Sequence, residues 1–402
     1  MGEGDKSRLG PTEFWRRPMA DINQIVQASV DTAIREGGEI GVQVAAYLKG
    51  ELVVDIWGGL ADETTGRMVN GDTLFPVFSV TKAVTATALH IQAERGLIEY
   101  DKPISHYWPE FAANGKGAAT VRDALTHRAG IPLMPAGVTL EQMCNWDWMI
   151  GQLAKMEPIF APGTTSAYHS YTFGWIIAEC VRRTDPKHRP FGRFIQEEIC
   201  APLGIDNLFM GIPDAAEPRI AQLTNMPAPP AGAPAPGPLR TGAIPAQVGV
   251  VQEVFGRPDV RRACIPGAGG IMNARSEAKF FAMLANGGAL GGVRLLSEER
   301  VRSFSTPRAN RGEVDQVLAR VLNLGISGFH LGGESPSAPP VIGSNPHTIS
   351  HPGAGGSIGW ADPDARLAVG ICHNRMFDAQ TPQDNPLQPI GDAIRQALGL
   401  SN

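Results

Sequence analysis

Cysteine is scarce in this chain and shows no pairing pattern. The 402 residues include five cysteines, an odd number, at Cys144, Cys180, Cys200, Cys264 and Cys372. No two of them have the C-x-x-C spacing that is typical of zinc and redox sites. The sequence therefore disfavours a disulfide framework and a cysteine-based metal site. We expect reduced thiols, no metal and no cofactor.

Long apolar runs and an excess of charge of one sign are also missing. The net charge is -5, with 19% charged residues, so there is no basic footprint for nucleic acid or for a membrane surface. No apolar run reaches membrane-spanning length, and the first residues, MGEGDKSRLGPTEFWRR, lack the apolar segment of a secretory signal. We therefore expect a cytoplasmic protein that binds a small neutral or mildly polar molecule, and neither nucleic acid nor membrane. The oligomeric state stays open.

The hydrophobic content, 43%, is sufficient for a large core. Apolar residues recur at helical spacing from Ile22 to Ile34, and Gly37 follows as a stop. The next stretch, VQVAAYLKGELVVDIWGG, predicts a β-hairpin that turns at Lys49-Gly50. Near the other end, extended runs flank a turn at residues 362–364, and a helical pattern covers about residues 390–398.

Hairpins near both ends, with helices outside them, predict one antiparallel sheet flanked by helices. We expect an α/β (α+β) sheet domain from residues 20–104 and 226–402, and a mainly helical lobe from 105–225. Residues 227–246 are rich in proline and glycine, which favours an irregular loop. A site for a small molecule is expected in a cleft between sheet and lobe.

Ser79 and Lys82 open the stretch SVTKAVTATALHIQ, in which the positions are apolar or small on nearly every side of a helical wheel. Such a helix is predicted to be buried. Lys82 would lie one turn from Ser79 on the same side, and a desolvated ammonium loses its proton more readily. The lysine could then act as base for the serine, whose position at a helix start favours an oxyanion. The alternative is that Ser79 only caps the helix and Lys82 is exposed.

Two other motifs compete with this pair. Ser276 and Lys279 repeat the S-x-x-K spacing, but their helix has one apolar stripe with Lys279 at its edge, so a helix cap is the favoured interpretation. Ser357 stands in a G-x-S-x-G match, but that motif needs a helix after the serine, and a β-type run follows here. We expect close backbone packing to explain the glycines around Ser357.

Three segments in order, SVTK at 79–82, PGTTSAYHS at 162–170 and SHPGAGG at 350–356, resemble the serine β-lactamase and penicillin-binding-protein superfamily. The likeness is to its class C-like branch, which includes the family VIII carboxylesterases. ALTHRAGIP at 124–132 and the stretch at 266–297 are similar to the same family. The resemblance implies the β-lactamase/transpeptidase-like fold, a helix-flanked antiparallel sheet plus an all-helical lobe.

The resemblance also implies the catalytic roles. Ser79 is the nucleophile, Lys82 its base partner, and Tyr168 a second base that returns a proton to the leaving group. A phenol with an ordinary pKa is a poor base at neutral pH, so we expect a cationic Lys82 to lower it. Which of the two takes the proton stays open. Tyr171 is a rival to Tyr168, but the tyrosine-x-serine pattern with Ser170 selects Tyr168, and a core role is expected for Tyr171.

In the third segment, the resemblance places the family's Lys-Thr-Gly-like strand at His351-Pro352-Gly353. Gly353 would let a substrate lie against the strand, and the N–H groups of Ala354 and Ser79 would form the oxyanion hole. His351 is a candidate substrate contact, with a plain structural histidine as the alternative. Ser170 is another such candidate. Tryptophans are candidate walls of an acyl or alcohol pocket, although aromatic residues are more often core: Trp146, Trp148 and Trp360.

His351 stands where the family has a lysine, and Ser170 stands where it has an asparagine. In the family, these two residues would hold a penicillin-like substrate. We therefore expect a serine carboxylesterase that hydrolyses small, short- to medium-chain esters through an acyl-serine intermediate, with weak β-lactamase activity. The alternatives are an acyltransferase of the same fold, a β-lactamase, D-amino-acid peptidase or small-amide hydrolase, and a non-catalytic binding module.

Overall fold

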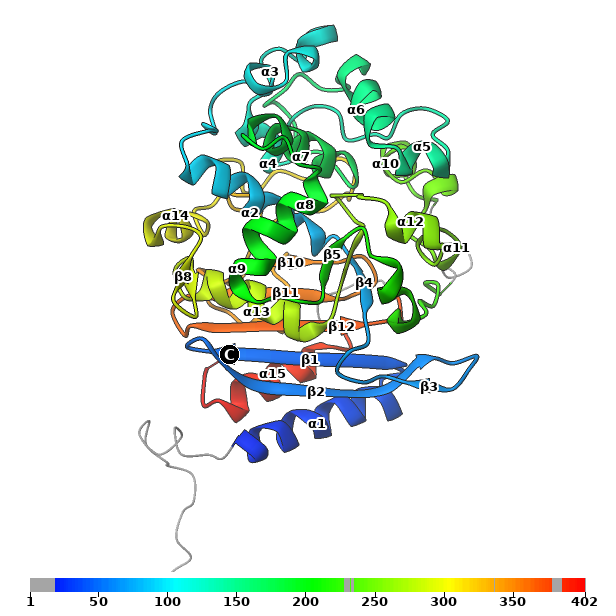
Figure 1. The fold of residues 1–402 in the computed structure, drawn as a ribbon, viewed down its shortest axis with the longest axis vertical. Coiled ribbons are helices and arrows are strands. Elements are labelled where there is room, and N and C mark those ends of the chain that lie inside the picture. The colour runs from blue at the N-terminus through cyan, green and yellow to red at the C-terminus, as the bar shows by residue number, and fades with distance from the viewer. Residues whose placement is uncertain (1–18, 228–231, 233–234, 336, 378–384, 402) are drawn as a thin grey trace, which may run out of the picture.

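A seven-stranded sheet crosses the molecule in the order β3-β2-β1-β12-β11-β10-β9 (Figure 1). The computed structural model describes residues 19–227, 232, 235–335, 337–377 and 385–401. All neighbouring strands in the sheet run antiparallel. The strands are β1 (Gly41–Leu48), β2 (Glu51–Asp62), β3 (Arg67–Met68), β9 (His330–Leu331), β10 (Ile349–Pro352), β11 (Ile358–Asp362) and β12 (Leu367–His373).

Strands from both ends of the chain meet in the middle of this sheet. β1 pairs with β12, so that Val42 lies opposite His373. The β1-β2 hairpin turns at Lys49 and Gly50, whose φ angles of 54° and 89° suit the primed turns that match strand twist. The expected antiparallel sheet and its α/β (α+β) class are confirmed.

Helices cover both faces of the sheet. α1 (Met19–Arg35) and α15 (Gln388–Ala397) pack together on one face, and α13 (Ala274–Ala285) packs on the other (Figure 1). β12 serves both layers, because Val369 and Ile371 join the α1/α15 core whereas Cys372 joins the core on the other side. Both faces of β12 are buried, which explains its continuous apolar run.

α2 (Thr81–Glu94) runs through the interior, and every residue from Thr81 to Ala93 is buried, as predicted. It packs against α7 (Thr172–Thr184). β4 (Phe75–Phe78) leads into α2 and belongs to a second sheet, in which β6 (Gly270–Met272) lies between β4 and β5 (Leu208–Met210). This small sheet fixes the start of α2.

Helices predominate between residues 105 and 225, as expected, but β5 in this range pairs with β6 from the other part of the chain. The division into two domains stays a prediction. The remaining elements of this range are α3 (Ile104–Tyr107), η2 (Pro109–Gly115), α4 (Val121–Leu125), α5 (Leu140–Cys144), α6 (Trp146–Lys155), α8 (Phe191–Ile195), η3 (Gln196–Cys200), α9 (Ala201–Leu203) and η4 (Asp214–Arg219). Later in the chain come α10 (Pro238–Ala243), η5 (Ala246–Val248), α11 (Gln252–Phe255), α12 (Pro258–Arg262), β7 (Ala289–Leu290), β8 (Val293–Arg294), α14 (Glu298–Ser303) and η6 (Pro340–Ile342).

The prediction of an irregular loop over 227–246 is wrong in part. Residues 228–231 and 233–234 lie outside the described residues, but Pro238–Ala243 forms α10. Pro238 stands at the first helical position, where a missing N–H costs nothing because that group has no partner inside the helix. Proline therefore starts a helix here, although its abundance favoured a loop.

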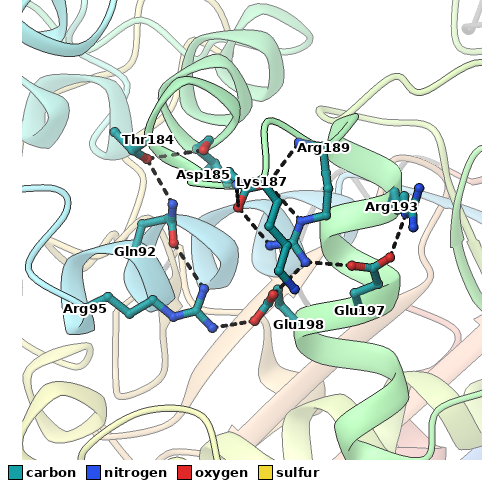
Figure 2. A network of polar contacts seen from close by, with 10 residues as sticks. Gln92, Arg95, Thr184, Asp185, Lys187, Arg189, Arg193, Glu197 and Glu198 are labelled. Carbon is teal, nitrogen blue, oxygen red and sulfur yellow. Dashed lines mark hydrogen bonds and ion pairs between the residues drawn. The ribbon is translucent and has the colours of Figure 1, made fainter.

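A buried arginine joins the helices around α2 (Figure 2). Arg189 donates to both carboxylate oxygens of Asp185 at 2.8 and 2.9 Å, and its Nη1 donates to Glu197 and Glu198. Glu198 also pairs with Arg95, which ends α2. The network thus connects α2 with η3 and with the segment after α7.

None of the five cysteines forms a disulfide; Cys180, Cys200 and Cys372 are buried, and Cys144 and Cys264 are partly exposed. None of the helices described in the structure combines the length and the apolar character that a membrane crossing requires.

Candidate active site

Ser79 occupies the turn between β4 and α2. The residue before it, Phe78, has a φ of 46°, a left-handed conformation that costs a residue with a side chain roughly 1–2 kcal/mol. Two contacts hold Phe78 there: its ring packs edge-on against Phe255, and its carbonyl accepts the hydroxyl of Thr81. The chain reverses at this point and leaves Ser79 partly exposed at the start of a buried helix.

Lys82 is fully buried, and its Nζ lies 2.9 Å from the Ser79 Oγ. The same nitrogen donates to the carbonyls of Ser170 and Gly267, at 2.7 Å each. Burial holds the pKa of Lys82 well below its ordinary value of 10.5, which favours the neutral amine. A neutral amine has two N–H groups and one lone pair, so the two carbonyls take the N–H groups and the lone pair is left for the Ser79 hydroxyl. This arrangement can accept the proton of Ser79.

The Gly267 carbonyl reaches Lys82 because its segment crosses α2 and α7 closely. Thr85 donates to the Pro266 carbonyl at 2.7 Å, and the Thr81 hydroxyl accepts the Gly270 N–H at 2.8 Å. A Cβ on Gly267 would press against the Tyr171 carbonyl, so glycine permits this approach. Gly267 was not predicted as a site residue, although glycine-rich stretches such as its surroundings, PGAGG, are typical of close backbone approach.

Tyr168 lies beside this pair, with its ring centroid 5.1 Å from the Lys82 Nζ. Burial raises the pKa of its phenol, and a hydrogen bond with Ser79 only partly opposes that effect. The expectation that a cationic Lys82 lowers the phenol pKa is wrong, because burial disfavours the charged form of both groups. Tyr171 instead donates to the Val248 carbonyl at 2.7 Å inside the core.

His351 is fully buried on β10, and its ring meets the ring of His330 edge-on at 5.0 Å. Its Nδ1 lies 3.0 Å from the Pro352 carbonyl, which can only accept, so Nδ1 carries the proton and Nε2 is an acceptor. Burial keeps the pKa of His351 well below its ordinary value, with His330 and Lys82 adding to the effect. His351 is therefore neutral and offers no positive charge to a carboxylate.

Two further buried histidines, which were not predicted as site residues, lie near the tyrosine. The His127 ring lies 4.3 Å from the Tyr168 ring and 5.8 Å from the His169 ring. Burial lowers the pKa of His169 to about 4 and that of His127 well below its ordinary value. Within the described part of the chain, no group of three or more histidine, cysteine, aspartate or glutamate residues is arranged to hold a metal ion. The histidines instead give the site polar but uncharged walls.

Gly353 lets two backbone segments pack closely, and the expectation that a substrate lies against its strand stays a prediction. A Cβ at this position would collide with the carbonyl oxygen of Val77, two residues before Ser79, so the glycine serves backbone packing of the β10 end against β4. The Gly353 N–H donates to the Ser357 carbonyl, and the Gly356 N–H donates to the Gly353 carbonyl. Ala354 belongs to the turn that these two hydrogen bonds close. An oxyanion hole made by the N–H groups of Ala354 and Ser79 stays a prediction.

The competing serines have structural contacts. Ser357 is buried, and its hydroxyl oxygen accepts the main-chain N–H of His373 at 3.2 Å. Asn273 is the N-cap of α13, and Ser276 lies inside the helix. The prediction that Ser276 caps this helix is therefore wrong. Lys279 donates to the Gly204 carbonyl at the surface.

The remaining candidates lie apart from Ser79 or contact the site differently. Trp360 is buried in the α1/α15 core, on the sheet face opposite α13, because strand residues alternate between faces, and the pocket role is wrong. Trp146 donates to Glu179 along α7 and stacks on Phe191. Trp148 is partly buried against the main core, and no contact places it beside Ser79. Ser170 reaches Lys82 through its main-chain carbonyl.

Known proteins resemble this chain in sequence and in fold. The family model described as Beta-lactamase matches residues 22–389. The chain is 36% identical over 373 residues to "Esterase/beta-lactamase LipL" of Mycobacterium tuberculosis, covering 89% of this chain and 82% of that protein. A solved family VIII carboxylesterase superposes with a TM-score of 0.84 at 31% identity, over 94% of this chain and 97% of the other.

A penicillin-binding protein homologue from Caulobacter crescentus is similarly close, with a TM-score of 0.83 and 32% identity over 94% of this chain and 98% of that chain. A class C β-lactamase at 17% identity shares the fold, with a TM-score of 0.67 over 94% of this chain and 99% of the other. The chain belongs to the beta-lactamase family, and it is a serine hydrolase with the β-lactamase/transpeptidase-like fold.

Proposed function

We propose that this protein is a carboxylesterase that hydrolyses small, short- to medium-chain esters through an acyl intermediate on Ser79. The observation that carries the proposal is the buried Lys82 amine, 2.9 Å from the Ser79 hydroxyl, with both of its N–H groups directed to carbonyls. A serine hydroxyl is a weak nucleophile until a base removes its proton. Lys82 can do so at neutral pH because burial lowers its pKa.

In the first half-reaction, Lys82 takes the Ser79 proton while Oγ bonds to the ester carbonyl carbon. The resulting oxyanion accepts hydrogen bonds from the N–H groups of Ser79 and Ala354. Tyr168, a protonated phenol at neutral pH, donates its proton to the alcohol oxygen as the C–O bond breaks. The Lys82 ammonium then returns a proton to Tyr168, and the acyl group stays on Ser79.

In the second half-reaction, water attacks the acyl carbon as its proton passes to Lys82, by way of Tyr168. When the tetrahedral intermediate collapses, the bond between Ser79 and the acyl group breaks. Ser79 recovers its proton from Lys82, and the carboxylic acid leaves. The pair returns to its starting protonation state, so one water is consumed for each ester.

A neutral substrate suits the walls of the site. The histidines beside Lys82 and Tyr168 are uncharged, and His351 presents an acceptor where a cation would be needed to hold a carboxylate. The relative named as an esterase/beta-lactamase favours weak β-lactam hydrolysis as a second activity. A cytoplasmic location is part of this proposal, since antibiotics and cell-wall peptides are met outside that compartment.

Intact mass spectrometry with a serine-directed phosphonate, together with hydrolysis of a chromogenic short-chain ester, tests the proposal. Wild type should turn over the ester and gain one phosphonyl group, and Ser79→Ala should do neither. Ser357→Ala, a matched control at a buried serine, should still form the adduct. An adduct that persists in Ser79→Ala would place the nucleophile elsewhere, and an unreactive wild type would favour a binding module. Parallel assays with a matched amide and a penicillin would measure how far esters are preferred.

A further inference from the structure

Asp315 is a fully buried carboxylate bonded to the tyrosine segment. Its Oδ1 accepts the main-chain N–H of Tyr168 at 3.0 Å, and its Oδ2 accepts the hydroxyl of Ser166 at 3.0 Å. The same Oδ1 accepts the N–H groups of Val317 and Leu318 at 3.0 Å each. One carboxylate therefore folds its own turn and attaches that turn to the residue that carries the phenol.

Side chains of the same turn pack around Tyr168. Val317 and Tyr168 belong to one small apolar cluster, separate from the main core, and Leu318 packs against it. Main-chain contact strengthens the link, because the Gln316 N–H donates to the Ser166 carbonyl at 2.9 Å. Behind the carboxylate, Arg308 donates to the Ser166 hydroxyl at 2.8 Å. Tyr168 is thus held by groups more than 140 residues away in the sequence.

The charge of Asp315 also acts on the phenol. Burial is the largest cause of the raised Tyr168 pKa, and the negative charge of Asp315 raises it further, against a hydrogen bond with Ser79. A nearby negative charge disfavours a phenolate. Asp315 therefore favours the form of Tyr168 that can donate a proton.

We propose that Asp315 is a positioning residue for Tyr168, which aims its phenol at the leaving-group oxygen. The inference rests on the proposed function, in which Tyr168 gives its proton to the departing alcohol. Donation matters most for esters of weakly acidic alcohols, because their alkoxides are poor leaving groups. An ester of a strongly acidic phenol needs little protonation, so it reports on Ser79 and Lys82 alone.

The test compares kcat/KM for an alkyl ester and a p-nitrophenyl ester of the same acid, in Asp315→Ala, Asp315→Asn and Tyr168→Phe. General acid catalysis contributes typically ~10²–10⁴-fold, so Tyr168→Phe should lose about that factor with the alkyl ester and far less with the p-nitrophenyl ester. Asp315→Ala should lose roughly 10–100-fold with the alkyl ester and less than about threefold with the other. Asp315→Asn keeps an oxygen for the three N–H groups and should recover most of this loss.

Glu313→Gln is the matched control. Glu313 accepts the Ser166 N–H at 2.8 Å and pairs with Arg128, so it holds the same segment without touching Tyr168. Glu313→Gln should lower stability but change kcat/KM by the same factor for both esters. In Asp315→Ala/Tyr168→Phe, the alkyl-ester loss should equal that of Tyr168→Phe alone, because residues that act through one group are not additive.

Equal losses for the two esters in Asp315→Ala, with the folded fraction measured by phosphonate labelling, would overturn the inference and leave Asp315 as a structural residue. Additive losses in the double variant would overturn it as well. Failure of the proposed function has a different signature, since wild type would then neither hydrolyse the p-nitrophenyl ester nor take up phosphonate.

Discussion

At the scale of single residues, two buried lysines receive different surroundings. Lys82 and Lys116 are both fully buried, and burial lowers the pKa of each. Lys116 donates to three carbonyls, of Ala113, Ala154 and Met156, so all the N–H groups of an ammonium have partners. Around Lys82, the Ser79 hydroxyl replaces the third carbonyl. That one exchange turns a structural lysine site into one with a reactive lone pair.

We expect Lys82→Met to lower the rate of phosphonate labelling by roughly 10³-fold or more, because Ser79 loses its base. Wild-type labelling should slow at acid pH as Lys82 becomes protonated, and this acid limb should vanish in the variant. Lys116→Met should destabilise the fold while labelling per folded molecule stays near the wild-type rate. Equal labelling in the two variants would contradict the assignment of Lys82 as base.

The sequence predicted Ser79, Lys82 and the tyrosine segment through short motifs, but not what connects them. The carbonyl that completes the lysine site belongs to Gly267, 185 positions from Lys82, and no local periodicity records a contact of that range. The position of Asp315 is similar, since its stretch, EVDQVL, is a turn without a repeating pattern. The prediction for Trp360 failed for another reason. Alternation in β11 shows which residues share a face of the sheet, but it does not show which face lies toward the site.

At the scale of elements, the end of β10 packs directly on the strand that leads to Ser79. We expect Gly353→Ala to destabilise the protein by about 1–3 kcal/mol and to reduce ester hydrolysis, because the new methyl group displaces Val77. Thermal unfolding and kcat/KM measure the two effects. Gly151→Ala, in α6 with open space around it, should be neutral or slightly stabilising. If Gly353→Ala left both the unfolding temperature and kcat/KM unchanged, β4 would have to be free to move away from the new methyl group.

The contact between α13 and the sheet contains an unusual carboxylate. Glu277 is fully buried, and its Oε2 accepts the Cys372 thiol at 2.9 Å. Burial raises its pKa to about 8 from an ordinary 4.5, and the thiol only partly opposes this. The folded protein therefore holds a proton that the unfolded chain releases above pH 4.5, so stability should decline as pH rises through this range and level off above pH 8.

We expect Glu277→Gln to remove this decline, which for a shift of this size amounts to at most about 5 kcal/mol. The difference in unfolding free energy between variant and wild type should grow in favour of the variant from pH 5 to pH 8. Denaturant unfolding across that range measures it. If the unfolding free energies of variant and wild type changed with pH in parallel, Glu277 would be ionised in the folded state.

At the scale of the whole molecule, acid stability should depend on the network around Arg189. Burial opposes ionisation of Asp185, but the hydrogen bonds from Arg189 outweigh it and lower the pKa to about 2 (Figure 2). The stabilisation is present above the ordinary pKa of 3.8 and is lost as pH falls through 2. It corresponds to about 2 kcal/mol.

Replacing the arginine tests this. Arg189→Met should destabilise the protein by roughly 3–5 kcal/mol at neutral pH, because Asp185 is left buried without its cation. The loss of stability of wild type between pH 4 and pH 2 should be smaller in the variant. Arg193→Met, at an exposed ion pair with Glu197, should change stability by less than about 1 kcal/mol. Equal effects of the two substitutions would contradict a special role for the buried arginine.

The pairing of β1 with β12 has a consequence for synthesis on the ribosome. β1 emerges early, but the strand that borders it on one side is made roughly 330 residues later, which takes about 20–70 s at ordinary rates of translation. Until then the nascent hairpin of β1 and β2 has an open edge and an uncovered apolar face, both of which favour aggregation. Productive folding of this hydrolase should therefore wait until β12 has emerged from the ribosome, and its yield in cells should depend on chaperones that protect the early strands.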